Sequence, residues 1–192
     1  MAILVAGLVI FFAVHSVRIF AEGWRAERIR RMGPRAWKGV YSVASIAGFV
    51  LLVWGYGLAR QASMDLWSPP AWTYTATAIL TLPAFILLAA AYVPGTRIKA
   101  VLGHPMLLGT KIWAFAHLLS NGRLADVLLF GSFLVWSVLA FKAARARDRS
   151  AGATYPALGA SRDVIAVIVG AVLWAAFALY LHGPLIGTRP FA

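Results

Sequence analysis

The sequence predicts an all-α, polytopic transmembrane bundle of about six helices, with five full spans plus a shorter helix as the alternative. Hydrophobic residues make up 61% of the 192 residues and charged residues only 12%. Soluble domains are about 45–50% apolar and about 25% charged. Apolar runs of about 20 residues recur, and each is long enough to cross about 30 Å of hydrocarbon. Transmembrane β-strands would instead be short segments of alternating polarity.

The helices are expected in six apolar segments. These are residues 2–20, 38–59, 72–93, 105–120, 124–142 and 163–182. The first segment has no basic residues before it and no small-residue cleavage site, so we expect a retained span rather than a signal peptide. The fourth begins at Pro105 and is the shortest, which is why five full spans are the alternative. The length suits one transmembrane domain over residues 1–192.

The formal net charge of +12 comes from basic residues in alternate connections between these segments. They are Arg25, Arg28, Arg30, Arg31, Arg35 and Lys38, then Arg97 and Lys99, and finally Lys142, Arg145, Arg147, Arg149 and Arg162. The intervening connections hold only Arg60 and Arg123. Because Lys and Arg are retained on the cytoplasmic side, this pattern predicts a bacterial inner-membrane protein with both termini periplasmic. It also argues against a nucleic-acid partner.

The placement of the acidic residues and the absence of cysteine exclude several kinds of site. None of the six acids lies in the middle of a predicted span, so a carboxylate proton relay or cation pathway has no candidate. The chain has no cysteine, so it offers no disulfide and no thiolate ligand. Histidine is therefore the residue type that points to a site.

His15 lies within the first segment, while His104 and His117 lie at the start and in the interior of the fourth. A single histidine in a span is often explained by a hydrogen bond between helices. Histidines on two different helices can also bind a metal or the iron of a haem, for which an apolar bundle interior is suitable. Depth in the membrane does not identify the partner of His15. At a rise of 1.5 Å per residue, His15 lies about 9 Å from the inner boundary of the membrane, His117 lies about 18 Å from it, and His104 lies near the boundary itself.

Lys111, inside the fourth segment, is a second candidate for cofactor binding. A lysine there can extend toward the interface, face a cavity or pair with a haem propionate. No residue is assigned a catalytic role, and whether the protein is an enzyme stays open.

Three stretches resemble the NnrU family. They are "AVHS" in the first segment, "MGPRAWKGVYSV" opening the second, and "GHPMLLGTKIWAFAHLLSNGRLADVLLFGSF" across the fourth and fifth. The resemblance covers roughly residues 1–142 and is looser beyond. The part of the resemblance that is most specific to the family is the combination of HPxxxG with a downstream IWxxAH.

The resemblance implies a bacterial inner-membrane protein associated with nitrite and nitric oxide reduction. NnrU proteins are similar to the 15-cis-ζ-carotene isomerases, membrane enzymes that use haem b held by two histidines. By motif, those ligands fall on His15 and His117. The resemblance therefore implies haem b as cofactor, membrane lipid as surroundings, and a small gas or hydrophobic molecule as ligand.

Two departures limit what the resemblance implies. The isomerases carry a cysteine where this chain has Ala114, and the family usually carries an arginine where it has Gly103. Haem binding needs only the imidazoles, so it is expected, but carotene isomerisation is not.

Two other functions stay open. One is a non-catalytic assembly or accessory factor for nitrogen-oxide reductases. The other is a membrane methyltransferase, because "HPMLLG" also resembles the isoprenylcysteine carboxyl methyltransferases, which bind S-adenosylmethionine. Those enzymes use further C-terminal acids, and residues 143–192 offer only Asp148 and Asp163.

Overall fold

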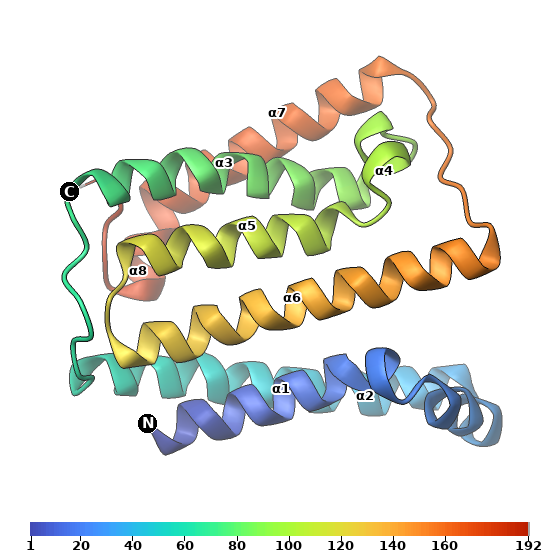
Figure 1. The fold of residues 1–192 in the computed structure, drawn as a ribbon, viewed down its shortest axis with the longest axis horizontal. Coiled ribbons are helices and arrows are strands. Elements are labelled where there is room, and N and C mark those ends of the chain that lie inside the picture. Colours follow the sequence, from blue (N-terminus) through green and yellow to red (C-terminus); the bar gives the residue numbers. More distant parts are fainter. Residues whose placement is uncertain (192) are drawn as a thin grey trace. The chain divides into compact units, whose positions relative to one another are not determined.

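The computed structural model describes residues 1–191, and these residues form helices joined by short connections (Figure 1). The helices are α1 (Ala2–Phe20), α2 (Glu22–Gln61), α3 (Trp72–Tyr92), α4 (Arg97–Leu102), α5 (Pro105–Ser120), α6 (Leu124–Ala151), α7 (Ala160–Ala176), the π-helix η1 (Phe177–Leu181) and α8 (His182–Ile186). Within the described residues the β-type pairing consists of one isolated bridge, between Asp65 and Arg123. The all-α prediction is confirmed.

In the part of the chain that the structure describes, five helical segments are long and apolar enough to cross a membrane: α1, α2, α3, α6 and the run from α7 to α8. The segment predicted at 105–120 forms α5, whose 16 residues are too few for a full span. Gly103, at φ 74°, ends α4, and Pro105 occupies the first turn of α5, so the two helices cannot merge. Residues 1–191 thus contain five candidate spans plus a shorter helix, the predicted alternative.

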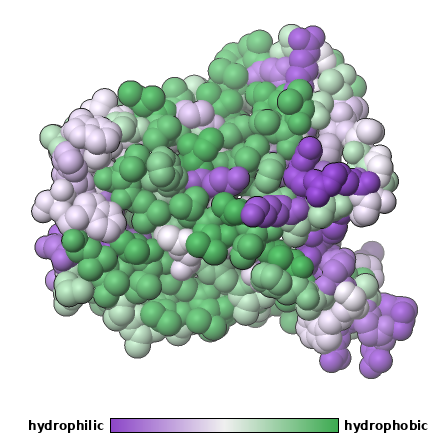
Figure 2. All heavy atoms as spheres, viewed as in Figure 1, coloured by the Kyte–Doolittle hydropathy of each residue, from purple (hydrophilic) through white to green (hydrophobic). Residues whose placement is uncertain are grey.

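The sides of these helices are covered by apolar residues, and hydrophilic residues gather mostly toward helix ends (Figure 2). On α7, for example, Val164, Ile168 and Val172 are each more than half exposed. A soluble protein would not leave apolar surface of this extent in water. The chain is therefore a polytopic membrane protein whose helices contact lipid.

Two helices extend beyond the predicted segments into the basic connections. α2 begins at Glu22 rather than near residue 38, and its first part is separated from the span by a kink at Gly33 (φ 83°), which precedes Pro34. Glu27 pairs there with Arg30 and Arg31, at the three- and four-residue spacings that stabilise a helix. α6 likewise continues to Ala151, so residues 143–151, expected to be part of a loop, are helical.

The chain divides into two compact units, and α6 contributes to both. The first comprises Met1–Leu66 and Arg123–Ser132. In it α1 packs along α2 at backbone contact: a Cβ built on Gly7 would lie 2.7 Å from the Cα of Leu52, and one built on Gly55 would lie 2.7 Å from the Cα of Leu4. Glycines allow this close approach, which favours packing of helices in lipid.

The second unit comprises Trp67–Gly122 and the chain from Phe133 onward. In it α3 packs against both α5 and α7. Thr77 donates from its hydroxyl to the carbonyl oxygen of Ala116 across 2.7 Å, and the indole of Trp174 donates to Thr81 Oγ1 across 3.0 Å. These bonds join α3 to its two neighbours.

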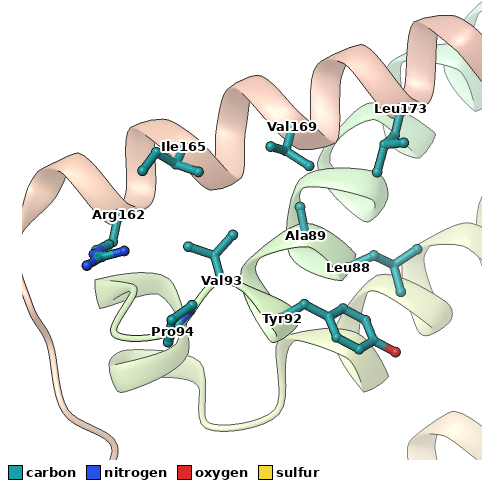
Figure 3. A pocket seen from close by; sticks show the side chains of 9 residues that line it. All are labelled: Leu88, Ala89, Tyr92, Val93, Pro94, Arg162, Ile165, Val169 and Leu173. Carbon is teal, nitrogen blue, oxygen red and sulfur yellow. The ribbon is translucent and has the colours of Figure 1, made fainter.

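An open groove of about 450 Å³ runs between α3 and α7 in this second unit (Figure 3). One wall is a row of α7 side chains that begins with Arg162 and ends with Leu173. The other wall is the C-terminal part of α3 and the residues that follow it, Val93 and Pro94. Arg162 is the charged residue of the lining, and the rest of the lining is apolar apart from the Tyr92 hydroxyl.

Candidate functional site

His15 lies in α1, in the first unit, and is half-buried. Its Nδ1 is 2.7 Å from the carbonyl oxygen of Phe11, one helical turn earlier. A carbonyl oxygen only accepts hydrogen bonds, so Nδ1 carries the proton and donates, and the acceptor lone pair of the neutral ring is on Nε2. The Phe11 ring stacks on the imidazole at 4.0 Å, and the Tyr41 ring lies 5.5 Å from it.

His117 lies in α5, in the second unit, and is also half-buried. Its Nδ1 donates to the carbonyl oxygen of Trp113 across 2.8 Å, and the two rings are 5.0 Å apart. The lone pair of the neutral ring is again on Nε2. Asn121 donates to the carbonyl oxygen of His117 across 2.9 Å and secures the last turn of α5.

His15 and His117 thus share one local arrangement, although they belong to different units. Histidines that bind metals almost always donate their second ring N–H to a carbonyl or carboxylate, which fixes the tautomer and the ring orientation. The two side chains therefore have the donor chemistry that an imidazole ligand of haem iron requires. Among residues 1–191 there is no group of three or more His, Cys, Asp or Glu side chains suited to holding a bare metal ion.

His104 is engaged differently. It is the N-cap residue of α5, and its Nε2 lies 2.9 Å from Oδ2 of Asp148, to which it donates. Since His104 precedes His117 by about 20 Å of helical rise, the two cannot bind the same iron. His104 thus donates from Nε2, whereas His15 and His117 donate from Nδ1.

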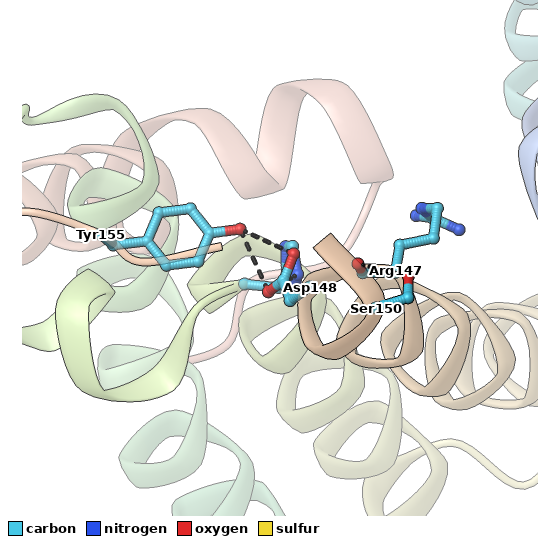
Figure 4. A network of polar contacts seen from close by, with 5 residues as sticks. Arg147, Asp148, Ser150 and Tyr155 are labelled. Carbon is cyan, nitrogen blue, oxygen red and sulfur yellow. Dashed lines mark hydrogen bonds and ion pairs between the residues drawn. The ribbon is translucent and has the colours of Figure 1, made fainter. Parts of the chain in front are cut away.

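A polar cluster surrounds His104 at the ends of α4, α5 and α6. The Tyr155 hydroxyl is 3.2 Å from both carboxylate oxygens of Asp148. The two side chains point toward one another in Figure 4. A Cβ built on Gly103 would lie 3.1 Å from Nη1 of Arg145. A guanidinium from α6 therefore lies beside Gly103. Burial and the adjacent Asp148 carboxylate raise the pKa of the Tyr155 phenol above its ordinary value.

Lys111 is half-buried on α5, six residues before His117, which corresponds to about 9 Å along the helix. Its Nζ lies 4.8 Å from the centre of the Phe141 ring, in cation–π contact. The contact directs the ammonium group toward α6.

The chain matches the family model described as NnrU protein over residues 3–190. It belongs to the NnrU family. The resemblance carried by the histidine motifs is thus confirmed, and it extends through the C-terminal third and across both units of this NnrU protein. No curated protein and no solved structure matches the chain.

Two polar contacts of this NnrU protein were not predicted from its sequence. Asp148 was assigned no role, yet it holds His104 and Tyr155. Asp126 has no predicted function, yet it is 3% exposed and accepts a 2.7 Å hydrogen bond from the Tyr56 hydroxyl. The partners are 44 and 70 residues apart along the chain, so no local pattern indicates either pair.

Proposed function

We propose that this NnrU protein binds haem b in the membrane, with His15 and His117 as the ligands of the iron. The observation that supports the proposal most directly is the matching pair of Nδ1 hydrogen bonds, to the carbonyls of Phe11 and Trp113. Each places the lone pair of a neutral imidazole on Nε2. The motif resemblance implies the same two residues, and the Nε2 of His104 is engaged by Asp148.

Bound haem supplies one-electron chemistry and, at an open coordination position, affinity for small ligands such as nitric oxide. The side chains would control access to that position. A gas or small hydrophobic molecule could approach only after one imidazole rotated away. The Nδ1 bonds to Phe11 and Trp113 oppose that rotation, and so does the Phe11 ring stacked on His15. Lys111 is proposed to neutralise a haem propionate.

Visible spectroscopy tests the ligation. The protein is purified in detergent, and spectra are recorded in the oxidised and dithionite-reduced states. We expect a Soret band with sharp reduced α and β bands, lost in both His15→Ala and His117→Ala. His182→Ala is the matched control, because His182 Nδ1 also donates to a carbonyl, that of Thr188 at 2.7 Å, but the residue lies outside the proposed site. His104→Ala should also keep the bands.

Two outcomes would overturn the ligation. One is a colourless protein that takes up no added haem, which would leave the non-catalytic assembly role. The other is loss of the bands in His182→Ala to the same degree as in His15→Ala and His117→Ala. Lys111→Gln should release haem more readily while keeping the band positions, because Lys111 is not a ligand.

We further propose that the protein resides in a bacterial inner membrane, with both termini periplasmic, and serves nitrite or nitric oxide reduction. The alternation of basic connections supports the orientation. It also requires the shorter α5 to return the chain to the side on which α3 begins, and the Trp67 N–H, before α3, donates to the carbonyl oxygen of Gly122, after α5, across 3.3 Å. Because the chain has no cysteine of its own, single introduced cysteines can report the orientation of the protein in the membrane. In intact spheroplasts an impermeant maleimide should label Ser68→Cys, and Ser150→Cys only after lysis; both sites are exposed. The reverse pattern would overturn the orientation.

A further inference from the structure

We propose that the groove between α3 and α7 is a binding site for one acidic phospholipid, with its acyl chain in the groove and its phosphate on Arg162. The site is separate from the proposed haem ligands. It lies wholly within the second unit and involves none of the histidines.

The length and lining of the groove fit an acyl chain. Arg162, Ile165, Val169 and Leu173 follow one another along one face of α7, toward the groove (Figure 3). From Arg162 to Leu173 the helix rises about 16 Å. One leaflet of a bilayer contributes about 15 Å of hydrocarbon, half of the full thickness of about 30 Å. The groove therefore extends about one leaflet deep, with its apolar part where the chain of a lipid would lie.

The charge at the end of the groove fits an anionic headgroup. Arg162 is in the first turn of α7, and among residues 1–191 no carboxylate forms an ion pair with it. The neighbouring carboxylate of Asp163 accepts a 3.2 Å hydrogen bond from the Ile98 backbone N–H, in the first turn of α4. Arg162 is thus available to a phosphate, which a guanidinium can bind through two parallel hydrogen bonds.

Headgroup selectivity follows from the surroundings of Arg162. The same end of the second unit carries further basic residues, among them Arg97 and Lys99 on α4. A zwitterionic headgroup brings its own cation into this positive field, whereas an acidic headgroup does not. The site should therefore prefer phosphatidylglycerol to phosphatidylcholine with the same chains.

Native mass spectrometry of the full-length protein in detergent tests the proposal. Dioleoyl phosphatidylglycerol and dioleoyl phosphatidylcholine are titrated separately, and the bound fractions are compared. Arg162→Gln should weaken phosphatidylglycerol binding about fivefold, the effect expected for one cation near the headgroups. Arg149→Gln is the matched control, because it removes one exposed charge outside the groove and should change binding little.

A second pair of variants tests the apolar part without changing charge. Val169→Phe fills the groove, whereas Val167→Phe places the same ring on α7 outside the lining. Only Val169→Phe should reduce the lipid-bound fraction. This pair decides the proposal if Arg162→Gln fails to fold.

Four results would overturn the proposal. They are equal affinity for the two lipids, equal losses in Arg162→Gln and Arg149→Gln, unchanged binding in Val169→Phe, and a protein dimer in place of a lipid adduct. The last result would show that a second copy of the chain covers the groove.

Discussion

His104 donates from Nε2 to Oδ2 of Asp148 across 2.9 Å, and this bond joins the N-cap of α5 to the C-terminal part of α6. Both side chains are less than a quarter exposed. Hydrogen bonds to a charged group contribute about 1.5–3 kcal/mol when they are shielded from water. The bond is therefore expected to stabilise the second unit.

Replacing either partner should lower thermal stability. We expect His104→Ala and Asp148→Asn each to reduce the free energy of unfolding by about 1–3 kcal/mol, measured by circular dichroism in detergent. Asp65→Asn is the control, because it breaks the ion pair with Arg123 at a carboxylate that is 75% exposed and should cost less than about 1 kcal/mol. Equal effects at the two sites would contradict a stabilising role for the His104 bond.

Tyr155 should make stability depend on alkaline pH. Because its folded-state pKa is raised by burial and by Asp148, the folded protein holds the phenolic proton more tightly than the unfolded chain does. Its contribution is fully present below the unfolded pKa of about 10 and is lost as pH rises from there through the folded pKa. The melting-temperature difference between wild type and Tyr155→Phe should be constant at neutral pH and shrink above about pH 10. A constant difference at all pH values would refute this.

Free imidazole should rescue variants that lack a proposed haem ligand. His15→Gly and His117→Gly remove the side chains, so haem should be lost and should return when millimolar imidazole is added. Rescue separates ligation from a purely structural role, since added imidazole cannot restore packing. The readout is the reduced α band, and His104→Gly should show neither the loss nor a response to imidazole.

Tyr56 and Asp126 should be energetically coupled. Tyr56→Phe removes the 2.7 Å donor to a carboxylate that is 3% exposed, which should cost about 1–3 kcal/mol. The Asp126 side chain also accepts from the backbone N–H of Arg123, so Asp126→Asn disturbs a second bond. In a double-mutant cycle the combined variant should lose less than the sum of the two single losses. Strict additivity would show that the bond contributes nothing.

Glycines in α2 should differ sharply in their tolerance of side chains. A Cβ on Gly55 would collide with the α1 backbone at Leu4, so Gly55→Leu should separate the helices and cost about 1–3 kcal/mol or more. Gly57 is two residues further on in the same helix, and nothing lies within 4 Å of a Cβ placed there. Gly57→Leu should therefore be nearly neutral in the same unfolding assay. Comparable losses would mean that the packing is not close.

The sequence was sufficient for features that depend on local composition. Hydropathy over about 20 residues predicted the spans, because crossing hydrocarbon requires that much apolar helix. The shortness of α5 followed from Pro105, and the histidine motifs indicated the family. The i−4 hydrogen bonds of His15 and His117 are also local, since a helix brings each imidazole to its own preceding turn.

The helical arm before Gly33 and the extension of α6 to Ala151 were missed, because charged residues conceal a helix from a hydropathy argument. Ion pairs within the helix, such as Glu27 with Arg30, provide the stability that burial does not. Their three- and four-residue spacing was the one signal available in the sequence.

Apolar composition and motif spacing alone determined that this is a helical membrane protein of the NnrU type with histidine candidates on two helices. Only the tertiary structure decided that Asp148 holds His104, that Asp126 holds Tyr56, and that a groove ending at Arg162 opens between α3 and α7. The physical reason is the separation along the chain of the residues that interact. Hydropathy is a property of neighbouring residues, whereas these contacts join side chains 44 to 70 residues apart, or helices far apart along the chain, and arise only when the helices pack.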